Sequence, residues 1–140
     1  MRILGLDYGR RRIGLALSDE GGELASPLST HVRSRSEFKD LVALAGLFKQ
    51  HEVERFVVGL PLHMDGSAGE MATEAEAFGR KLEAKTGRPI EFFDERLTSA
   101  EAERVLLEAN LTRERRRELR DSLSAVLILQ GYLDRRNRSS

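Results

Sequence analysis

The amino-acid sequence predicts an α/β protein in which a mixed sheet of five strands carries helices on both faces. Five short runs of apolar and β-branched residues can each form a strand. From residue 34 onwards, apolar residues recur at helical intervals between these runs. The expected order of elements is βββαβαβαα, in which an antiparallel three-strand meander precedes two strands that follow helices and therefore run parallel.

The first three expected strands form the meander. Residues 3–7 (ILGLD) have the apolar character of a buried strand, and residues 12–18 (RIGLALS) follow across a glycine-containing turn, as a hairpin partner would. Residues 25–33 form the third strand. We place it at an edge of the sheet because Pro27 cannot donate a hydrogen bond to a neighbouring strand.

Helices and strands alternate in the rest of the chain. The first helix leads to a buried strand at residues 55–61, and the second leads to the last strand at residues 89–95. A third helix should end near Asn110, and a final helix from Thr112 should end near Arg135. Capping-box spacing predicts the start of the first three helices, at Ser34 and Glu37, at Ser67 and Glu70, and at Thr98 and Glu101.

Length and composition are those of one globular domain. The 140 residues are 40% hydrophobic and 33% charged, and no stretch is apolar enough to span a membrane. We expect a single domain over residues 1–135 and a short polar tail over residues 136–140. A strand pattern begins almost at the N-terminus, which leaves no room for a signal peptide and predicts a cytoplasmic protein.

The absence of cysteine narrows the chemistry. It excludes disulfides, thiolate nucleophiles and cysteine-based zinc sites. The three histidines, His31, His51 and His63, are scattered and lack the spacing of a histidine metal site. A metal ion would therefore depend mainly on carboxylates.

Acidic residues are expected to meet at one edge of the sheet. Asp7 ends the first strand, and Asp94 and Glu95 end the last strand. Ligands of open α/β sheets gather at the carboxyl ends of parallel strands, so these positions should lie close together. Because successive residues of a strand point to opposite faces, only one of Asp94 and Glu95 should face the same side as Asp7.

Asp121 is a carboxylate on an otherwise apolar face of the final helix. Ala125 and Ile128 follow it at i+4 and i+7, which places it on the stripe that should pack against the sheet. A half-buried carboxylate is costly unless it is paired. Its partner is either an arginine, such as Arg96 or Arg120, or a metal ion.

Acids from three elements that converge on one point are typical ligands of a hard cation such as Mg²⁺ or Mn²⁺. Two such ions can activate a water molecule and stabilise the leaving oxygen during phosphodiester cleavage. Without metal, clustered carboxylates would repel one another and raise one another's pKa. The cluster is therefore interpreted as a metal site.

Arginines near these acids are candidates for contacts to a phosphate backbone. The formal net charge is zero, but 19 of the 23 basic residues are arginine, which suits bidentate phosphate contacts. The alternative is a charged hairpin tip at residues 10–12 and a solvated helix face at residues 112–120. The candidate backbone contacts are Arg10, Arg11, Arg12, Arg96, Arg116 and Arg120.

The segment GLPLHMDGS, residues 59–67, follows a strand and precedes a helix. Gly59 and Ser67 would let the backbone approach a phosphate that faces the amides of a helix N-terminus. The alternative is an ordinary loop that ends in a capped helix.

Four segments together carry a pattern that covers nearly the whole chain, namely LGLDYGRRRIGLALSD, VVGLPLHMDGS, FFDERLTSAEAE and RDSLSAVLILQGYL. In this order and spacing they resemble the YqgF/RuvX family of bacterial Holliday-junction-resolvase-like nucleases, within the RNase H-like superfamily. The resemblance implies an RNase H-like fold. One departure is Ser124, where the family pattern mostly has alanine.

The resemblance also implies an acidic triad. It falls on Asp7, on Glu95 with Asp94 in reserve, and on Asp121, as catalytic residues that bind two Mg²⁺ or Mn²⁺ ions. Two substrates are implied, four-way DNA junctions and the 5′ end of the 16S ribosomal RNA precursor. A homodimer is expected if the substrate is a DNA junction, because two paired nicks need two active sites.

Two other functions compete with a metal-dependent nuclease. The motif GLDYG also resembles the phosphate loop of sugar-kinase or actin-like ATPases, but 140 residues leave no room for the two duplicated domains that those folds require. A nucleic-acid-binding ribosome-assembly module with little or no catalysis is the second alternative. It predicts nucleic-acid binding without cleavage that depends on a divalent metal.

Overall fold

A five-stranded mixed sheet organises the chain. The computed structural model describes residues 2–98 and 113–138, with side chains on the last helix described from Ser122 onwards. The strand order across the sheet is β3-β2-β1-β4-β5. β1 pairs antiparallel with β2 and β2 with β3, whereas β1 pairs parallel with β4 and β4 with β5. The predicted meander and parallel crossovers are therefore confirmed. The strands are β1 Arg2–Asp7, β2 Arg12–Ser18, β3 Ala25–Val32, β4 Val53–Leu60 and β5 Ile90–Asp94.

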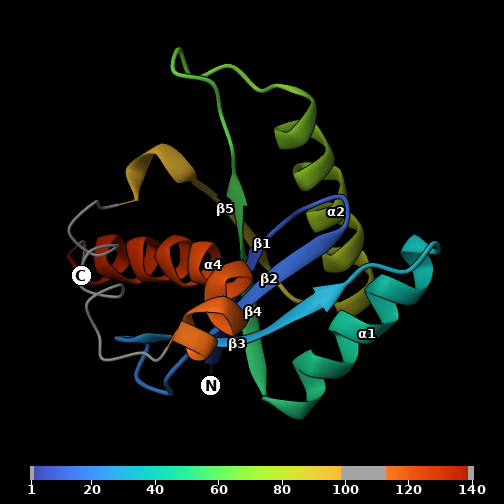
Figure 1. Cartoon of the computed structure of the whole chain (residues 1–140), viewed down its shortest axis with the longest axis horizontal. Helices are drawn as coiled ribbons and strands as arrows, with labels where there is room; N and C mark the ends of the chain where they lie inside the picture. Colours follow the sequence, from blue (N-terminus) through green and yellow to red (C-terminus); the bar gives the residue numbers. More distant parts are fainter. Residues whose placement is uncertain (1, 99–112, 139–140) are drawn as a thin grey trace.

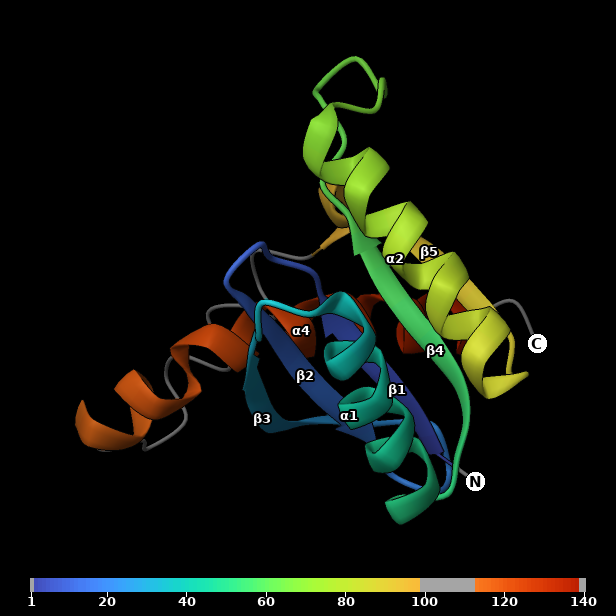
Figure 2. The ribbon, with the colours of Figure 1, turned by 90° about the vertical axis from the view of Figure 1, so that its right-hand side faces the viewer.

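Helices cover both faces of this sheet, as the sequence predicts. α1 and α2 pack on one face, and α4 crosses the other (Figures 1 and 2). α4 continues past Arg135, where the sequence pattern predicted its end. The helices are α1 Glu37–Gln50, α2 Glu70–Thr86, the 3-10 helix η1 Glu95–Leu97 and α4 Arg113–Arg138. Among the described residues, no helix is both long and apolar enough to cross a bilayer.

Two of the predicted helix caps are wrong. α1 is capped by Ser36, whose hydroxyl accepts from Lys39 N–H, while the Ser34 hydroxyl donates to the Ser36 carbonyl. α2 begins after Gly69 without a side-chain cap, because the Ser67 hydroxyl donates to Asp65 instead. The third predicted helix, from Thr98 to Asn110, lies almost entirely outside the described residues.

Alternation along β1 divides its side chains between two cores. Leu4 and Leu6 belong to the core beneath α1 and α2, whereas Ile3 belongs to the core beneath α4. Gly5 also faces α4, since a Cβ atom there would lie 2.8 Å from Leu129 Cβ. α4 therefore packs directly on β1, and Asp7, two residues further along, is on the same face.

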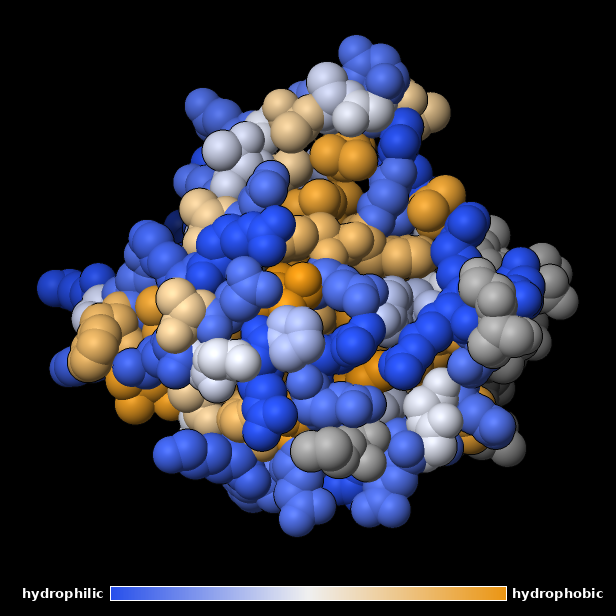
Figure 3. Space-filling view, turned by 180° about the vertical axis from the view of Figure 1, so that it is seen from behind, coloured by the Kyte–Doolittle hydropathy of each residue, from blue (hydrophilic) through white to orange (hydrophobic). Residues whose placement is uncertain are grey.

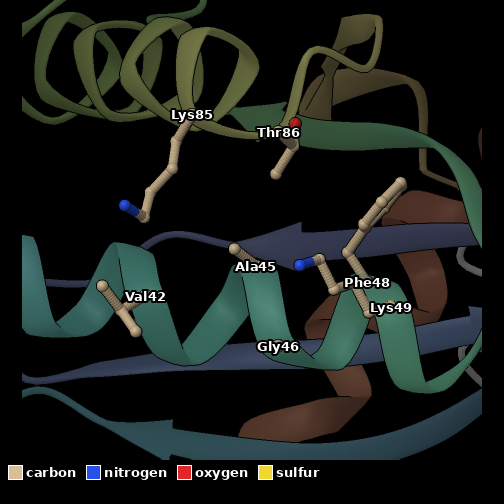
Figure 4. A pocket seen from close by; sticks show the side chains of 7 residues that line it. All are labelled: Val42, Ala45, Gly46, Phe48, Lys49, Lys85 and Thr86. Atoms are coloured by element: carbon tan, nitrogen blue, oxygen red, sulfur yellow. The ribbon is translucent and has the colours of Figure 1, made fainter.

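The opposite face carries a groove between α1 and α2. It has a volume of 400 Å³, with Val42, Ala45 and Phe48 along α1 and Lys49 and Lys85 among its other lining residues (Figure 4). Seen from behind, the surface is mainly hydrophilic, with hydrophobic side chains showing through between the charged ones (Figure 3). The groove lies on the face that α1 and α2 cover, whereas the Asp7 side chain is on the face that α4 covers.

Candidate active site

Asp7 lies at the edge of the sheet where the antiparallel ladder of β1 ends. Its register partner on β2 is Gly14, and its side chain lines a cavity of 260 Å³ beneath α4. This is the carboxyl end of a parallel strand, the place where ligands of such sheets gather. The residues around the cavity are Asp7, Glu95, Thr98, Ser124, Leu127 and Ile128.

Glu95 is the acid that the structure brings to Asp7. It opens η1 directly after β5, and its carboxyl group donates a hydrogen bond to the Asp7 carboxylate. Ser124, from α4, also hydrogen-bonds to Asp7. Three separate elements, β1, η1 and α4, thus place oxygen atoms around one point.

Asp94 is held elsewhere. Its carboxylate accepts from the Arg96 guanidinium at 2.6 and 2.9 Å, and from the Arg96 backbone N–H at 3.0 Å, so it caps η1. The hydrogen bond and charge of Arg96 lower the pKa of Asp94. Glu95 therefore faces the cavity and Asp94 does not, as the alternation of side chains along a strand predicts.

Gly59 makes the approach of Glu95 to the sheet possible. A Cβ atom at this position on β4 would clash with Ile128 Cδ1 and would lie 2.6 Å from Glu95 Oε1. Gly59 is buried and paired with Phe93 within the sheet. The structure thus places this glycine directly against Glu95 and Ile128, two residues that line the cavity, and its missing side chain leaves room for the Glu95 carboxylate.

The two neighbouring acids have altered proton affinities. Burial raises the pKa of Asp7, against the opposing effect of hydrogen bonds from Glu95 and Ser124. Burial and the adjacent charge of Asp7 raise the pKa of Glu95 to about 7. A carboxyl pair in which one member retains a proton near neutral pH has an unmet demand for positive charge.

The chemistry of this pair fits an oxygen-preferring divalent cation. Carboxylates and hydroxyls are hard ligands, and a cation between Asp7 and Glu95 would replace the shared proton. Within the described side chains, no three acidic or histidine residues form a metal-binding group. The third predicted ligand, Asp121, lies in α4 one turn before Ser124, but its side chain is outside the described part.

The predicted arginines differ in their surroundings. Arg10 pairs with Glu74 at 2.9 Å and with Glu70 at 3.5 Å, both on α2. Arg96, besides binding Asp94, donates to the Met64 carbonyl at 3.1 Å. Arg11, on the turn after Asp7, and Arg12, the first residue of β2, are both exposed. The side chains of Arg116 and Arg120 lie outside the described part of the chain.

The loop before α2 is closed by its own hydrogen bonds. Asp65 Oδ1 accepts from both the Ser67 N–H and the Ser67 hydroxyl, at 2.9 and 2.6 Å. Gly66 has a φ of 89°, which glycine adopts without strain, and its N–H donates to the His63 carbonyl. Both donor groups of Ser67 therefore bind Asp65. The contact between Ser67 and a phosphate stays a prediction.

Sequence reasoning did not single out Thr98 as a residue of this cavity, and it noticed Ser124 only as a departure from the family pattern. Thr98 follows η1, and its hydroxyl donates to the Glu95 carbonyl at 2.9 Å. The position of Ser124, three residues after Asp121 on a helix, was the available signal for a shared helix face.

Comparison with known proteins agrees with this architecture. The sequence model of the family described as "RuvX: Holliday junction resolvase" matches residues 1–135. A Moorella thermoacetica protein named "Putative pre-16S rRNA nuclease" is 53% identical over 135 residues, which is 96% of each chain. A protein of the same name from Syntrophomonas wolfei is 50% identical over 134 residues, 96% of this chain and 94% of that one.

The fold also has a counterpart among solved structures. Thermus thermophilus RuvC in complex with a Holliday junction substrate superposes with a TM-score of 0.62 at 15% identity, over 100% of this chain and 98% of that one. This likeness is one of fold, the RNase H-like fold, whereas the family match extends over nearly the whole sequence. The chain belongs to the RuvX family.

Proposed function

We propose that this chain is a nuclease that uses divalent metal ions to hydrolyse phosphodiester bonds in structured nucleic acid. Membership of the RuvX family makes it a nuclease. The observation that carries the metal-dependent mechanism is the contact between the Asp7 and Glu95 carboxyl groups in one cavity at the carboxyl edge of the sheet.

Asp7, Glu95 and Asp121 are the residues that would hold the metal, as Mg²⁺ or Mn²⁺ and most simply as two ions. Bound there, the ions would supply an activated water and stabilise the leaving oxygen. Asp7 is central because it accepts hydrogen bonds from both Glu95 and Ser124. The raised pKa of Glu95 supports the assignment, since the pair is fully ionised near neutral pH only when a cation neutralises it.

Arginines on the turn after Asp7 would hold the substrate. Arg11 is exposed on the turn next to the end of β1, and arginine binds backbone phosphates well. Arg12, the first residue of β2, is exposed beside it. Arg10 and Arg96 already bind Glu74 and Asp94, so a phosphate would compete with these carboxylates for the two guanidinium groups. Arg116 and Arg120 remain predicted contacts on the first half of α4.

Two substrates follow from the relatives. The similar curated proteins carry the name of pre-16S rRNA nucleases, and the RuvC structure holds a Holliday junction. We therefore propose precursor ribosomal RNA and four-way DNA junctions as the substrates to compare. For a junction, we expect a homodimer, because two symmetric nicks need two active sites.

The test is cleavage of a synthetic four-way junction and of a precursor rRNA fragment side by side, with Mg²⁺, Mn²⁺ or EDTA. Asp7→Asn should abolish cleavage and retain binding, because the amide keeps the shape but loses the charge. Glu91→Gln is the matched control, because it also removes an acid on the α4 side of the sheet. Glu91 pairs with Arg55 and lies near the start of β5, away from the Asp7 cavity. Binding of both substrates without metal-dependent cleavage would instead identify a ribosome-assembly module.

A further inference from the structure

We propose that Arg33 is a positioning residue, which holds the backbone directly after Asp7 and thereby aligns the Asp7 carboxylate in the cavity. The proposal rests on the proposed function and names a residue that acts on the same site from outside it. Arg33 follows β3 and does not line the cavity. Its guanidinium lies over the rings of Tyr8 and Phe78, on the side of the sheet that α1 and α2 cover.

The buried carboxylate of Asp40 anchors Arg33. Asp40, in the first turn of α1, has no exposed surface, and it accepts from Arg33 Nε at 3.1 Å and from His31 Nε2 at 2.9 Å. The Ser34 N–H is a third donor, at 2.9 Å. Burial opposes ionisation, but these hydrogen bonds outweigh it and lower the pKa of Asp40 to about 2. The anchor is therefore a carboxylate at every pH at which the protein would work.

The other end of the guanidinium reaches the two residues that follow Asp7. Arg33 Nη1 donates to the Tyr8 hydroxyl at 2.9 Å and to the Gly9 carbonyl at 3.3 Å. Its guanidinium carbon lies 5.1 Å from the centre of the Tyr8 ring, which in turn packs against Phe78 with 5.3 Å between ring centres. The Arg33 backbone N–H donates to the Arg11 carbonyl at 2.8 Å.

These contacts begin where the sheet stops supporting the chain. The parallel ladder of β1 with β4 ends at Leu6, and the antiparallel ladder with β2 ends at Asp7. Tyr8 and Asp7 are successive residues on opposite faces, so a rotation that moved one would move the other. The backbone up to Asp7 is thus held by the sheet, and the two residues directly after it are held by Arg33.

Only an arginine can make this connection. Its planar guanidinium presents several N–H donors in a fixed geometry, so Nε can bind Asp40 while Nη1 binds Tyr8 and Gly9. A lysine at this position would keep the charge next to Asp40 but offers a single nitrogen. Arg33→Lys therefore separates the positioning role from the role of neutralising a buried carboxylate.

Arg55→Lys is a matched control, because the chain repeats the same chemistry away from the site. Arg55 Nη1 donates to the Tyr132 hydroxyl at 3.1 Å and to Glu91 at 2.6 Å, from a side chain that is 28% exposed. It lies near the start of β4, at the opposite edge of the sheet from Asp7. Both variants lose an arginine–tyrosine–carboxylate connection, but only one of these connections touches the backbone after Asp7.

The experiment compares wild type, Arg33→Lys and Arg55→Lys in the full chain. The measurements are Tm, Mn²⁺ affinity by titration calorimetry, and kcat and KM for the cleaved substrate. Residues that orient metal ligands typically change metal affinity or activity by about 10–100-fold. We expect Arg33→Lys to lower kcat and Mn²⁺ affinity within that range with KM little changed, while Arg55→Lys lowers only Tm.

Equal losses in the two variants, confined to Tm, would overturn the proposal. If Arg33→Lys does not fold, Tyr8→Phe removes one acceptor of Arg33 and keeps the ring, and it should weaken Mn²⁺ binding in the same direction. A wild-type protein that binds Mn²⁺ but cleaves neither substrate would contradict the proposed function alone, since calorimetry would still decide whether Arg33 positions Asp7. A wild-type protein that binds no Mn²⁺ would overturn both.

Discussion

The replacement Gly59→Ala tests whether the close packing of Glu95 against β4 is needed for activity. The added methyl group would clash with Ile128 Cδ1 and would lie 2.6 Å from Glu95 Oε1. Both neighbours are ends of side chains, so they can move, but Ile128 is fully buried and has little room. The Glu95 carboxylate is the group more free to shift, and a shift would disturb its contact with Asp7.

The cost in stability can be worked out from these contacts. Overpacking a core position costs about 1–3 kcal/mol, and replacing glycine by alanine returns about 0.5–1 kcal/mol by restricting the unfolded chain. The net loss is therefore at most about 2.5 kcal/mol, which corresponds to a Tm lower by at most about 9 °C for 140 residues, at about 2.1 cal/mol/K of unfolding entropy per residue. The protein should therefore remain folded at 25 °C.

The assay is kcat at saturating substrate and Mn²⁺, measured below the unfolding transition. We expect a loss of at least about tenfold, because a metal ligand that is displaced by even a fraction of an ångström loses productive geometry. Gly79→Ala is the control: its methyl group would lie 2.8 Å from the Phe92 ring, on the other face of the sheet. If Gly59→Ala and Gly79→Ala lowered Tm alike and both kept full kcat, the reasoning would be refuted.

Three further predictions concern the acids and the exposed arginines. The metal-free protein should lose stability as pH rises from about 4.5 to about 7, because the folded state holds the Glu95 proton that the unfolded chain releases. Thermal melts should show this slope, and Glu95→Gln should reduce it. Asp94→Asn should retain Mn²⁺-dependent cleavage whereas Glu95→Gln should lose it, and the reverse result in a nuclease assay would make Asp94 the ligand. Arg11→Gln should weaken substrate binding and reduce the slope of log affinity against log salt by about 1; an unchanged slope in fluorescence titrations would show that Arg11 touches no phosphate.

The fold was predictable because its signals are periodic and local. The apolar runs at residues 3–7 and 55–61 overlap the observed strands β1 and β4. Segments with helical spacing lie between the strands that prove to be parallel. The helix caps were less predictable. Ser34 and Ser67 have the required spacing, but Asp40 binds the Ser34 N–H and Asp65 binds the Ser67 hydroxyl. Tertiary and neighbouring partners decided the outcome, and spacing carries no information about them.

The alternation of side chains along a strand predicted part of the site. Alternation reduced Asp94 and Glu95 to one inward-facing acid, and the structure supplied the reason for the choice, since Arg96 binds Asp94. The pairing of Arg10 with Glu74 spans 64 residues, and no sequence pattern indicates it. The same is true of Arg33, whose link to Tyr8 depends on three segments that meet only in the folded chain.

The central claim is that the Asp7–Glu95 pair holds the divalent metal on which cleavage depends. The most direct measurement is the rate of cleavage as a function of Mn²⁺ concentration, for wild type and Asp7→Asn, on whichever of the two substrates the wild type cleaves. We predict a saturating dependence on Mn²⁺ for wild type, and for Asp7→Asn no cleavage at any Mn²⁺ concentration with substrate binding retained. Equal rates for the two proteins, or wild-type cleavage that persists in EDTA, would contradict the account.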